Sequence, residues 1–333
     1  MKTTGVYKLH IFLFLLPALI LFIGILIAPI AMSTYYSLFE FKTITGADRT
    51  YVGFQNYTTL FSRQLWNPET QQFFENNKYL GDALVNALIL AALSVFVQLP
   101  LALLVALRLG KGIKGERAYL SIFFMPVLIS TVIIGRLWMN IYSPEDGGIL
   151  NAALKSLGVD TWLFPKITDY IRSSRAANGI NWTGTFTGQW TGHREIALGA
   201  AFIPILWQYV GYHMLLMYAG VKGVPTDLLE AAQLDGCTEW QVNRHIIIPY
   251  IKPILRVCVV FAVTGSLKSF DLVYTLMKDT TKAELPSTLM FKLLFLNQDY
   301  GMGSTIAVLL IVLCFAFALN ISLIFRNRGE KVA

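Results

Sequence analysis

Six long apolar segments, separated by polar stretches, dominate the pattern of this 333-residue chain. A helix needs about 20 mostly apolar residues to cross a bilayer, and every one of these segments is at least that long. The segments cover residues 11–37, 83–107, 118–141, 197–221, 248–275 and 304–325. The pattern therefore predicts an all-α integral membrane protein with six transmembrane helices, forming one transmembrane domain over residues 11–325.

The composition agrees with a membrane protein. Apolar residues make up 55% of the chain and charged residues only 14%, whereas soluble domains are nearer a quarter charged. The first apolar segment follows Lys2 and Lys8 and is longer than the roughly 7–15-residue core of a signal peptide. We expect it to remain in the protein as the first span.

The placement of Lys and Arg predicts the orientation in the membrane. Basic residues outnumber acidic ones in three polar stretches, residues 1–10, 108–117 and 326–333. The two long loops, 39–81 and 143–196, hold equal numbers of bases and acids. Since cytoplasmic loops carry the excess of Lys and Arg, both terminal tails are expected in the cytoplasm and both long loops outside. These outer loops either form a solvated cap or dock an external partner.

The same orientation places a charged loop, residues 222–247, on the cytoplasmic side between spans four and five. Its residues predict two short helices joined by a tight turn. Asp227 with Glu230 matches a capping box, and Gly236 fits a left-handed helix stop. Thr238 with Gln241 matches a second cap, from which a helix would run to the next proline.

Three interpretations of this loop compete on physical grounds. A DNA-binding helix-turn-helix is disfavoured, because the unit is tethered between spans and nearly neutral, so no nucleic-acid partner is expected. A purely structural amphipathic hairpin is the simplest interpretation. The third is a docking element for a cytoplasmic protein, in which exposed Ala231 and Ala232 would allow a close approach.

Residues 230–249, EAAQLDGCTEWQVNRHIIIP, resemble the EAA loop of permease subunits in binding-protein-dependent ABC importers. The stretches 51–61, 125–158 and 299–313 further resemble sugar permeases of the maltose and glycerol-phosphate type, the first permease of the pair. The resemblance covers about residues 10–326. The residues that match the loop motif are Glu230, Ala231, Ala232, Gly236, Ile246, Ile248 (where the family has Leu) and Pro249.

The resemblance implies that the 222–247 loop is a cytoplasmic coupling-helix loop that seats in an ATPase. Glu230 and Gly236 would shape this contact, and Ala231 and Ala232 would permit close packing. It also implies a bacterial inner membrane location and a set of partners. The partners are a second homologous permease in a heterodimer, two ATP-binding-cassette ATPase subunits and an extracytoplasmic solute-binding protein.

The chain itself is not expected to be an enzyme or to bind a cofactor. It has no G-x-x-x-x-G-K-[ST] phosphate loop, since GKGIKG at 110–115 lacks the final Lys and Ser or Thr. Its three cysteines are widely separated and show no metal-ligand spacing, so neither a catalytic residue nor a metal site is predicted. ATP and magnesium would bind to the partner ATPase subunits.

Polar side chains within spans four and five are candidates for a substrate path, because such residues are costly in a bilayer. The candidates are Gln208, Tyr209, Tyr212, Ser266 and Ser269. Amides and hydroxyls beside aromatic rings suit a neutral polyhydroxylated solute, and the corresponding parts of resembling sugar permeases line the translocation path. The alternative is that these residues make interhelical hydrogen bonds. Lys268 and Asp271, three residues apart, either pair with each other or face the solute.

These observations predict the permease subunit of an ABC importer for a carbohydrate, with an oligosaccharide favoured. A glycerol phosphate, a polyol or an acidic oligosaccharide remains an alternative solute. A secondary transporter is the rival class, but such proteins often show inverted repeats and more buried ionisable residues than this chain has.

Overall fold

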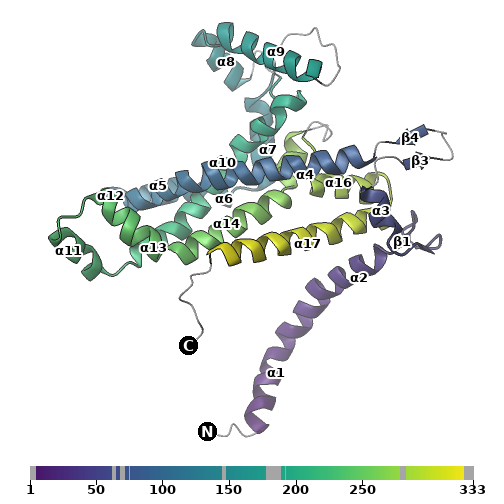
Figure 1. Ribbon diagram of the computed structural model, residues 1–333, viewed down its shortest axis with the longest axis horizontal. Coiled ribbons are helices and arrows are strands. Elements are labelled where there is room, and N and C mark those ends of the chain that lie inside the picture. Colours follow the sequence, from purple (N-terminus) through teal and green to yellow (C-terminus); the bar gives the residue numbers. More distant parts are fainter. Residues whose placement is uncertain are drawn as a thin grey trace. The chain divides into compact units, whose positions relative to one another are not determined.

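The computed structural model describes residues 5–61, 65–67, 72–74, 76–144, 148–177, 189–191, 193–277 and 283–325. The chain is predominantly helical, as predicted (Figure 1). The elements are α1 (Gly5–Leu21), α2 (Ala28–Tyr36), β1 (Phe39–Glu40), β2 (Thr50–Tyr51), α3 (Gln55–Phe61), β3 (Leu65–Asn67), β4 (Gln72–Phe74), α4 (Asn76–Leu93), α5 (Leu99–Gly110), α6 (Glu116–Leu128), α7 (Thr131–Ile141), α8 (Ile149–Ser156), α9 (Asp160–Ala177), α10 (Arg194–Lys222), α11 (Thr226–Leu234), α12 (Glu239–Val242), α13 (Ile248–Tyr250), α14 (Lys252–Leu267), α15 (Asp271–Leu276), α16 (Pro286–Phe291) and α17 (Tyr300–Phe325). π-Helical turns occupy Phe22–Ile27, Ser94–Gln98, Asn243–Ile247 and Lys292–Leu296.

Among the described residues, four helical stretches are long and apolar enough to cross a membrane without a break. They are His10–Tyr36, Leu80–Gly110, Glu195–Lys222 and Tyr300–Phe325. Two further segments qualify as bent pairs, which makes up to six spans if each pair is one span. The number of apolar segments therefore agrees with the six predicted from the sequence.

Two of the predicted spans, the third at 118–141 and the fifth at 248–275, are bent rather than straight helices. The third bends by 95° between α6 and α7, and the fifth by 72° between Tyr250 and Lys252. Proline is the physical reason in the fifth, since Pro249 and Pro253 flank the bend and lack the N–H that would continue the helical hydrogen bonds. The fifth segment breaks again between α14 and α15.

The chain forms two compact units, and the first comprises residues 1–81 and 289–313. Two short antiparallel hairpins, β1–β2 and β3–β4, lie in the predicted outer loop 39–81, so the fold is not purely helical. Asn56 holds the first hairpin to the end of α2, because its Nδ2 donates to the carbonyls of Ser37 and Phe39, each at 2.9 Å. The guanidinium of Arg49 lies 5.0 Å from the ring of Phe41, which adds a cation–π contact to the same hairpin.

The second unit comprises residues 82–288 and 314–333. Helix α10 is central to it and packs on α5, α6 and α14. Its backbone touches that of α6 directly, since a Cβ added at Gly211 would collide with the Phe123 carbonyl oxygen. Small residues allow this close approach between membrane helices. Ala102 and Ala106 on α5 are fully buried in the same core.

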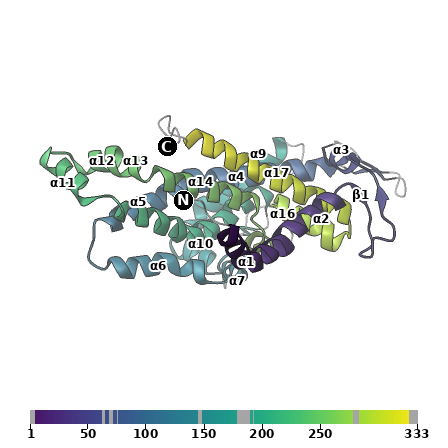
Figure 2. The same ribbon diagram turned by 90° about the horizontal axis from the view of Figure 1, so that it is seen from below.

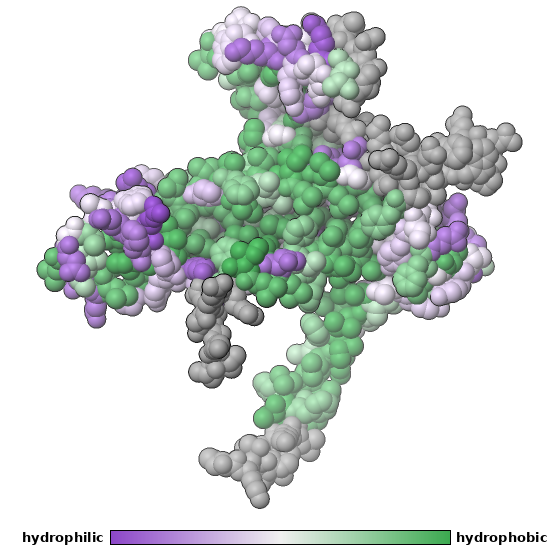
Figure 3. Space-filling model, viewed as in Figure 1, coloured by the Kyte–Doolittle hydropathy of each residue, from purple (hydrophilic) through white to green (hydrophobic). Residues whose placement is uncertain are grey.

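The surface of the second unit separates by polarity (Figure 3). Apolar side chains cover its helical body. Polar side chains gather over α11 and α12, which lie at one end of the unit in both ribbon views, and over α8 and α9 (Figures 1 and 2). Helices α8 and α9 belong to the predicted outer loop 143–196, part of which, including residues 178–188, lies outside the described residues. The apolar body is the part suited to lipid.

Candidate functional site

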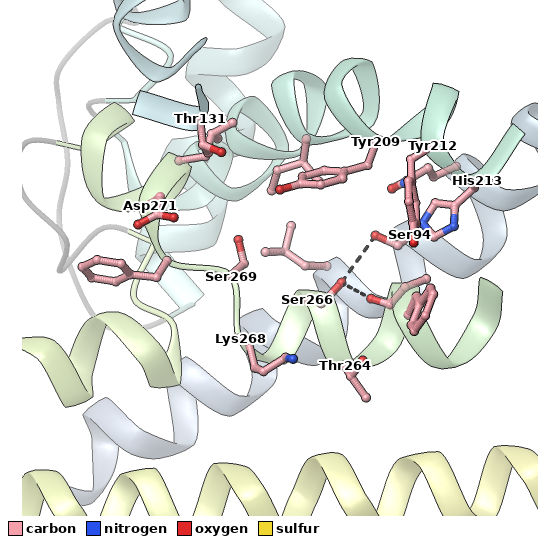
Figure 4. Close-up of a pocket in the computed structure, with 18 of the residues that line it drawn as sticks. Ser94, Thr131, Tyr209, Tyr212, His213, Thr264, Ser266, Lys268, Ser269 and Asp271 are labelled. Carbon is pink, nitrogen blue, oxygen red and sulfur yellow. Dashed lines mark hydrogen bonds between the residues drawn. The ribbon is translucent and has the colours of Figure 1, made fainter. Parts of the chain in front are cut away.

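A cavity of about 440 Å³ lies inside the second unit and draws its walls from four segments far apart in the sequence. The π-helical turn between α4 and α5, the α6–α7 break, α10, and α14 with the residues after it all contribute. Figure 4 shows polar side chains entering this space from each of these segments. The polar lining residues are Ser94, Gln98, Thr131, Tyr209, Tyr212, His213, Thr264, Ser266, Lys268, Ser269 and Asp271.

A break in the fifth segment brings backbone to the cavity wall. Helix α14 ends at Leu267 and α15 begins at Asp271, and the three residues between them all line the cavity. The Oγ of Ser287 donates to the Leu267 carbonyl at 3.2 Å, which satisfies one acceptor at the end of the helix. Non-helical backbone at membrane depth is tolerated where it is buried in protein or lines a cavity. The position of the break at the cavity wall therefore explains why non-helical backbone is tolerated there.

The structure brings together four of the five predicted path residues. Tyr209, Tyr212, Ser266 and Ser269 all line the cavity. Gln208 does not: it is buried, and its Nε2 donates to the hydroxyl of Thr131 at 3.3 Å. For Gln208 the geometry matches the alternative of an interhelical hydrogen bond, here between α10 and α7.

Lys268 and Asp271 both line the cavity, and no ion pair joins them in the part of the chain that the structure describes. Figure 4 shows the two side chains leaving the break in different directions. Both charges therefore belong to the cavity wall.

Sequence reasoning missed the contributions of spans two and three. Ser94 and Gln98 lie in the second segment, four residues apart in an otherwise apolar run, and Thr131 begins α7. The signal in the second segment was this pair of polar residues followed by Pro100. Proline lacks the N–H that an α-helix would direct to Phe96, and the hydrogen bond from Leu99 N–H reaches back to the Ser94 carbonyl instead.

The 222–247 loop has the predicted helix–turn–helix form. Helix α11 is followed by Gly236, whose φ of 73° is the left-handed conformation that glycine adopts without strain. The capping box at α12 is confirmed: the Thr238 N–H donates to Gln241 Oε1 at 2.7 Å, and the Gln241 N–H donates to Thr238 Oγ1 at 3.4 Å. Local sequence therefore determines the turn and the second helix.

Two expectations for this loop are wrong. Helix α11 begins at Thr226 after Pro225, without a side-chain cap, so Asp227 lies in the first turn rather than at the N-cap. Pro225 occupies the N-cap itself, and its side chain has no atom that could accept a hydrogen bond from the first helix amides. Ala232 is buried rather than exposed, with 5% of its surface accessible, whereas Ala231 is exposed.

The remaining motif residues divide between surface and interior. Glu230 and Gly236 are exposed, and so is Pro249 in α13. Ile246 is half-buried and packs against a small core around Val221, Val224, Ile247 and Ile251. The motif therefore supplies both an exposed face, near Glu230 and Ala231, and a hydrophobic base that anchors the loop to α10 and α14.

Two polar ties connect the 222–247 loop to the turn between α5 and α6. At one end, Lys111 Nζ lies 2.5 Å from Glu239 Oε2 at the start of α12. At the other, Glu116 accepts hydrogen bonds from the Tyr218 hydroxyl and, at 3.3 Å, from Lys222 Nζ near the end of α10. The two ties link the ends of the α5–α6 turn to the start of α12 and to the end of α10.

Comparison with known proteins identifies the family. Residues 98–327, more than half of the chain, match the model of the binding-protein-dependent transport system inner membrane component family. The chain belongs to this family. It is therefore a multi-pass inner membrane permease of an ABC importer, and a transport component rather than a catalytic one.

The similarity to individual relatives covers almost the whole chain. The chain is 30% identical to the osmoprotective compounds uptake permease protein GgtC of Synechocystis sp., across 90% of this chain and 93% of the relative. It is 26% identical to the diacetylchitobiose uptake system permease protein NgcF of Streptomyces coelicolor, across 93% of this chain and 80% of that one.

A solved structure shares the fold. It is the crystal structure of a bacterial ABC transporter involved in the import of the acidic polysaccharide alginate, with a TM-score of 0.73, 21% identity and 97% of each chain covered.

Proposed function

We propose that this permease forms the membrane path for a neutral carbohydrate, with an oligosaccharide favoured, and that the cavity of the second unit is part of that path. The observation that carries the proposal is the lining, which combines the rings of Tyr209, Tyr212 and Phe261 with the hydroxyls of Ser266 and Ser269. Aromatic rings stack on the C–H faces of sugars, while hydroxyls meet the ring oxygens and hydroxyls. The cavity volume is within the range of pockets that hold small molecules.

The names of several relatives support this substrate class. One is the trehalose/maltose transport system permease protein MalF of Thermococcus litoralis, 27% identical over 96% of this chain, and the diacetylchitobiose permease is another. An acidic oligosaccharide is the second candidate, and one observation favours it: Lys268 lines the cavity without an ion-pair partner among the described residues. Asp271 in the same wall opposes a net attraction for anions.

The proposed assembly is the one that the sequence predicts. A second homologous permease, two ATPase subunits and an extracytoplasmic binding protein would complete the importer. The 222–247 loop would seat in an ATPase, and its exposed Glu230 and Ala231 support this role. The Lys and Arg distribution supports cytoplasmic tails at 1–10 and 326–333, of which residues 1–4 and 326–333 lie outside the described residues.

Reconstitution into proteoliposomes tests the function. The permease is combined with its partner permease, ATPases and binding protein, and uptake of radiolabelled trehalose, maltose, diacetylchitobiose and a uronic-acid disaccharide is measured with and without ATP. We expect ATP-dependent uptake of a neutral sugar. Faster uptake of the uronic-acid disaccharide would replace the neutral class with the acidic one. Uptake by the permease without its ATPases would contradict the assembly.

A further inference from the structure

Two buried polar side chains at the cavity wall have hydrogen-bonding atoms without a partner among the described residues. Gln98 is 2% exposed and His213 is 4% exposed, and both line the cavity. The Oε1 of Gln98 and the Nδ1 of His213 are buried, and neither makes a hydrogen bond to any residue that the structure describes. Buried polar groups in proteins are nearly always paired, so each exception requires an explanation.

The position of Gln98 follows from the π-helical turn Ser94–Gln98. Such turns inside α-helices occur frequently at functional sites. Ser94 and Gln98, at the ends of the turn, are both buried and line the cavity, whereas Phe96 between them is 77% exposed. The turn thus directs its polar side chains to the cavity and its aromatic side chain to the exposed surface of the unit.

The neighbouring side chains make this part of the wall polar and ordered. Ser94 Oγ lies 3.4 Å from Ser266 Oγ, and Ser266 Oγ also donates to the Ala262 carbonyl at 2.8 Å. The ring of Tyr212 meets that of His213 edge-on, with centroids 5.4 Å apart. Figure 4 shows Ser94, Ser266, Tyr212 and His213 grouped together, away from Thr131 and Asp271.

We infer that Gln98 and His213 form a hydroxyl-recognition subsite for the transported carbohydrate. This inference rests on the proposed function and adds a specific role for the second span. A primary amide carries both donors and acceptors, and a neutral imidazole carries one of each. A sugar hydroxyl also donates and accepts, so it can pair with either atom.

The experiment measures how the reconstituted importer discriminates between a sugar and its monodeoxy analogues. The sugar is whichever of trehalose, maltose and diacetylchitobiose the wild type takes up fastest. Uptake is measured at saturating sugar-loaded binding protein, so that the cavity rather than the binding protein limits selection. The variants are Gln98→Met and His213→Phe, which remove hydrogen bonding at similar size, with His213→Gln as the conservative replacement.

Wild type is expected to transport at least one monodeoxy analogue about threefold to tenfold more slowly than the parent sugar, as expected for one lost hydrogen bond. Gln98→Met and His213→Phe should slow the parent sugar and abolish that difference, while His213→Gln should retain it. Phe96→Met, on the outer side of the same turn, is the matched control for perturbation of the helix and should behave as wild type.

The possible outcomes separate the two proposals. If the variants transport the parent sugar but still discriminate against the deoxy analogue as wild type does, the subsite is wrong and the proposed function stands. If wild type transports none of the neutral sugars, the proposed function itself is wrong. ATP hydrolysis stimulated by loaded binding protein is recorded for every variant, and its preservation shows that the assembly is intact.

Discussion

The 222–247 loop and the cavity are built in different ways. The loop is local: a proline, a left-handed glycine and one capping box, all between Pro225 and Gln241, give it its form. The cavity takes its wall from residues between Leu90 and Leu272, contributed by four segments. Short-range chemistry therefore shapes the proposed contact with the ATPase, whereas long-range packing shapes the proposed path for the solute.

Gly236→Pro should have the largest effect, because it changes the position at which the chain turns between α11 and α12. Proline fixes φ near −65°, while Gly236 has a φ of 73°. We expect uptake by the reconstituted importer to be lost while ATP hydrolysis persists and the chain still reaches the membrane. Gly236→Asn is the control, since asparagine tolerates the left-handed conformation. Normal uptake by the proline variant would remove the loop from the coupling mechanism.

Gly211→Ala tests the packing that holds the cavity. The added methyl group would meet the Phe123 carbonyl, so α6 and α10 must separate. Overpacking of this kind costs about 1–3 kcal/mol, and we expect a lower thermal unfolding midpoint together with slower uptake. Gly199→Ala is matched on the same helix and has nothing within 4 Å of its added Cβ. Equal midpoints for the two variants would contradict the close backbone contact.

Thr238→Ala removes a helix cap that the structure contains, whereas Asp227→Ala changes a residue that the sequence suggested as a cap and that the structure does not use as one. Thr238 completes a capping box at α12, whereas the N-cap of α11 is Pro225, without a side-chain hydrogen bond. Loss of a Thr cap costs about 1 kcal/mol. Hydrogen exchange should therefore become faster at the first amides of α12 in Thr238→Ala and stay unchanged at α11 in Asp227→Ala. Equally faster hydrogen exchange in both variants would show that Asp227 caps α11 after all, as the sequence suggested.

The smallest expected effect concerns the hydrogen bonds to Asp48, which lies in the β1–β2 hairpin outside the spans. The Thr43 hydroxyl and the Lys42 N–H donate to its carboxylate, and these hydrogen bonds lower the pKa of Asp48 from 3.8 to about 2. Because the folded pKa is the lower one, the stabilisation is complete above about pH 4 and is lost as the pH falls towards 2. The Lys42 amide should lose protection from hydrogen exchange in that window, and Asp48→Asn should remove the pH dependence.

Sequence patterns predicted the parts of the molecule that depend on neighbouring residues. The six apolar segments, the Gly236 turn and the Thr238 cap all follow from rules that act over a few residues. The burial of Ala232 could not be predicted in this way, because it depends on how α11 folds back on the rest of its unit.

The cavity shows the same limit. Tyr209, Tyr212 and Ser266 were identified because polar side chains within an apolar span are conspicuous, and they do line one space. Whether such a side chain faces a cavity or a neighbouring helix depends on helix rotation, so the sequence left both alternatives open for Gln208, whose amide donates to Thr131 in the structure. Ser94 and Gln98 were missed because only the polar residues of spans four and five were considered, although this polar pair before Pro100 marks the π-helical turn.

The two ties between the α5–α6 turn and the 222–247 loop have a consequence for stiffness. Lys111 holds the start of α12, and Glu116 holds the end of α10. Exposed ion pairs of this kind are each worth at most about 1 kcal/mol, so they are too weak to lock the loop. Because they connect the α5–α6 turn with α10 and α12, a displacement of the loop would strain these contacts as well as the backbone of the flanking helices.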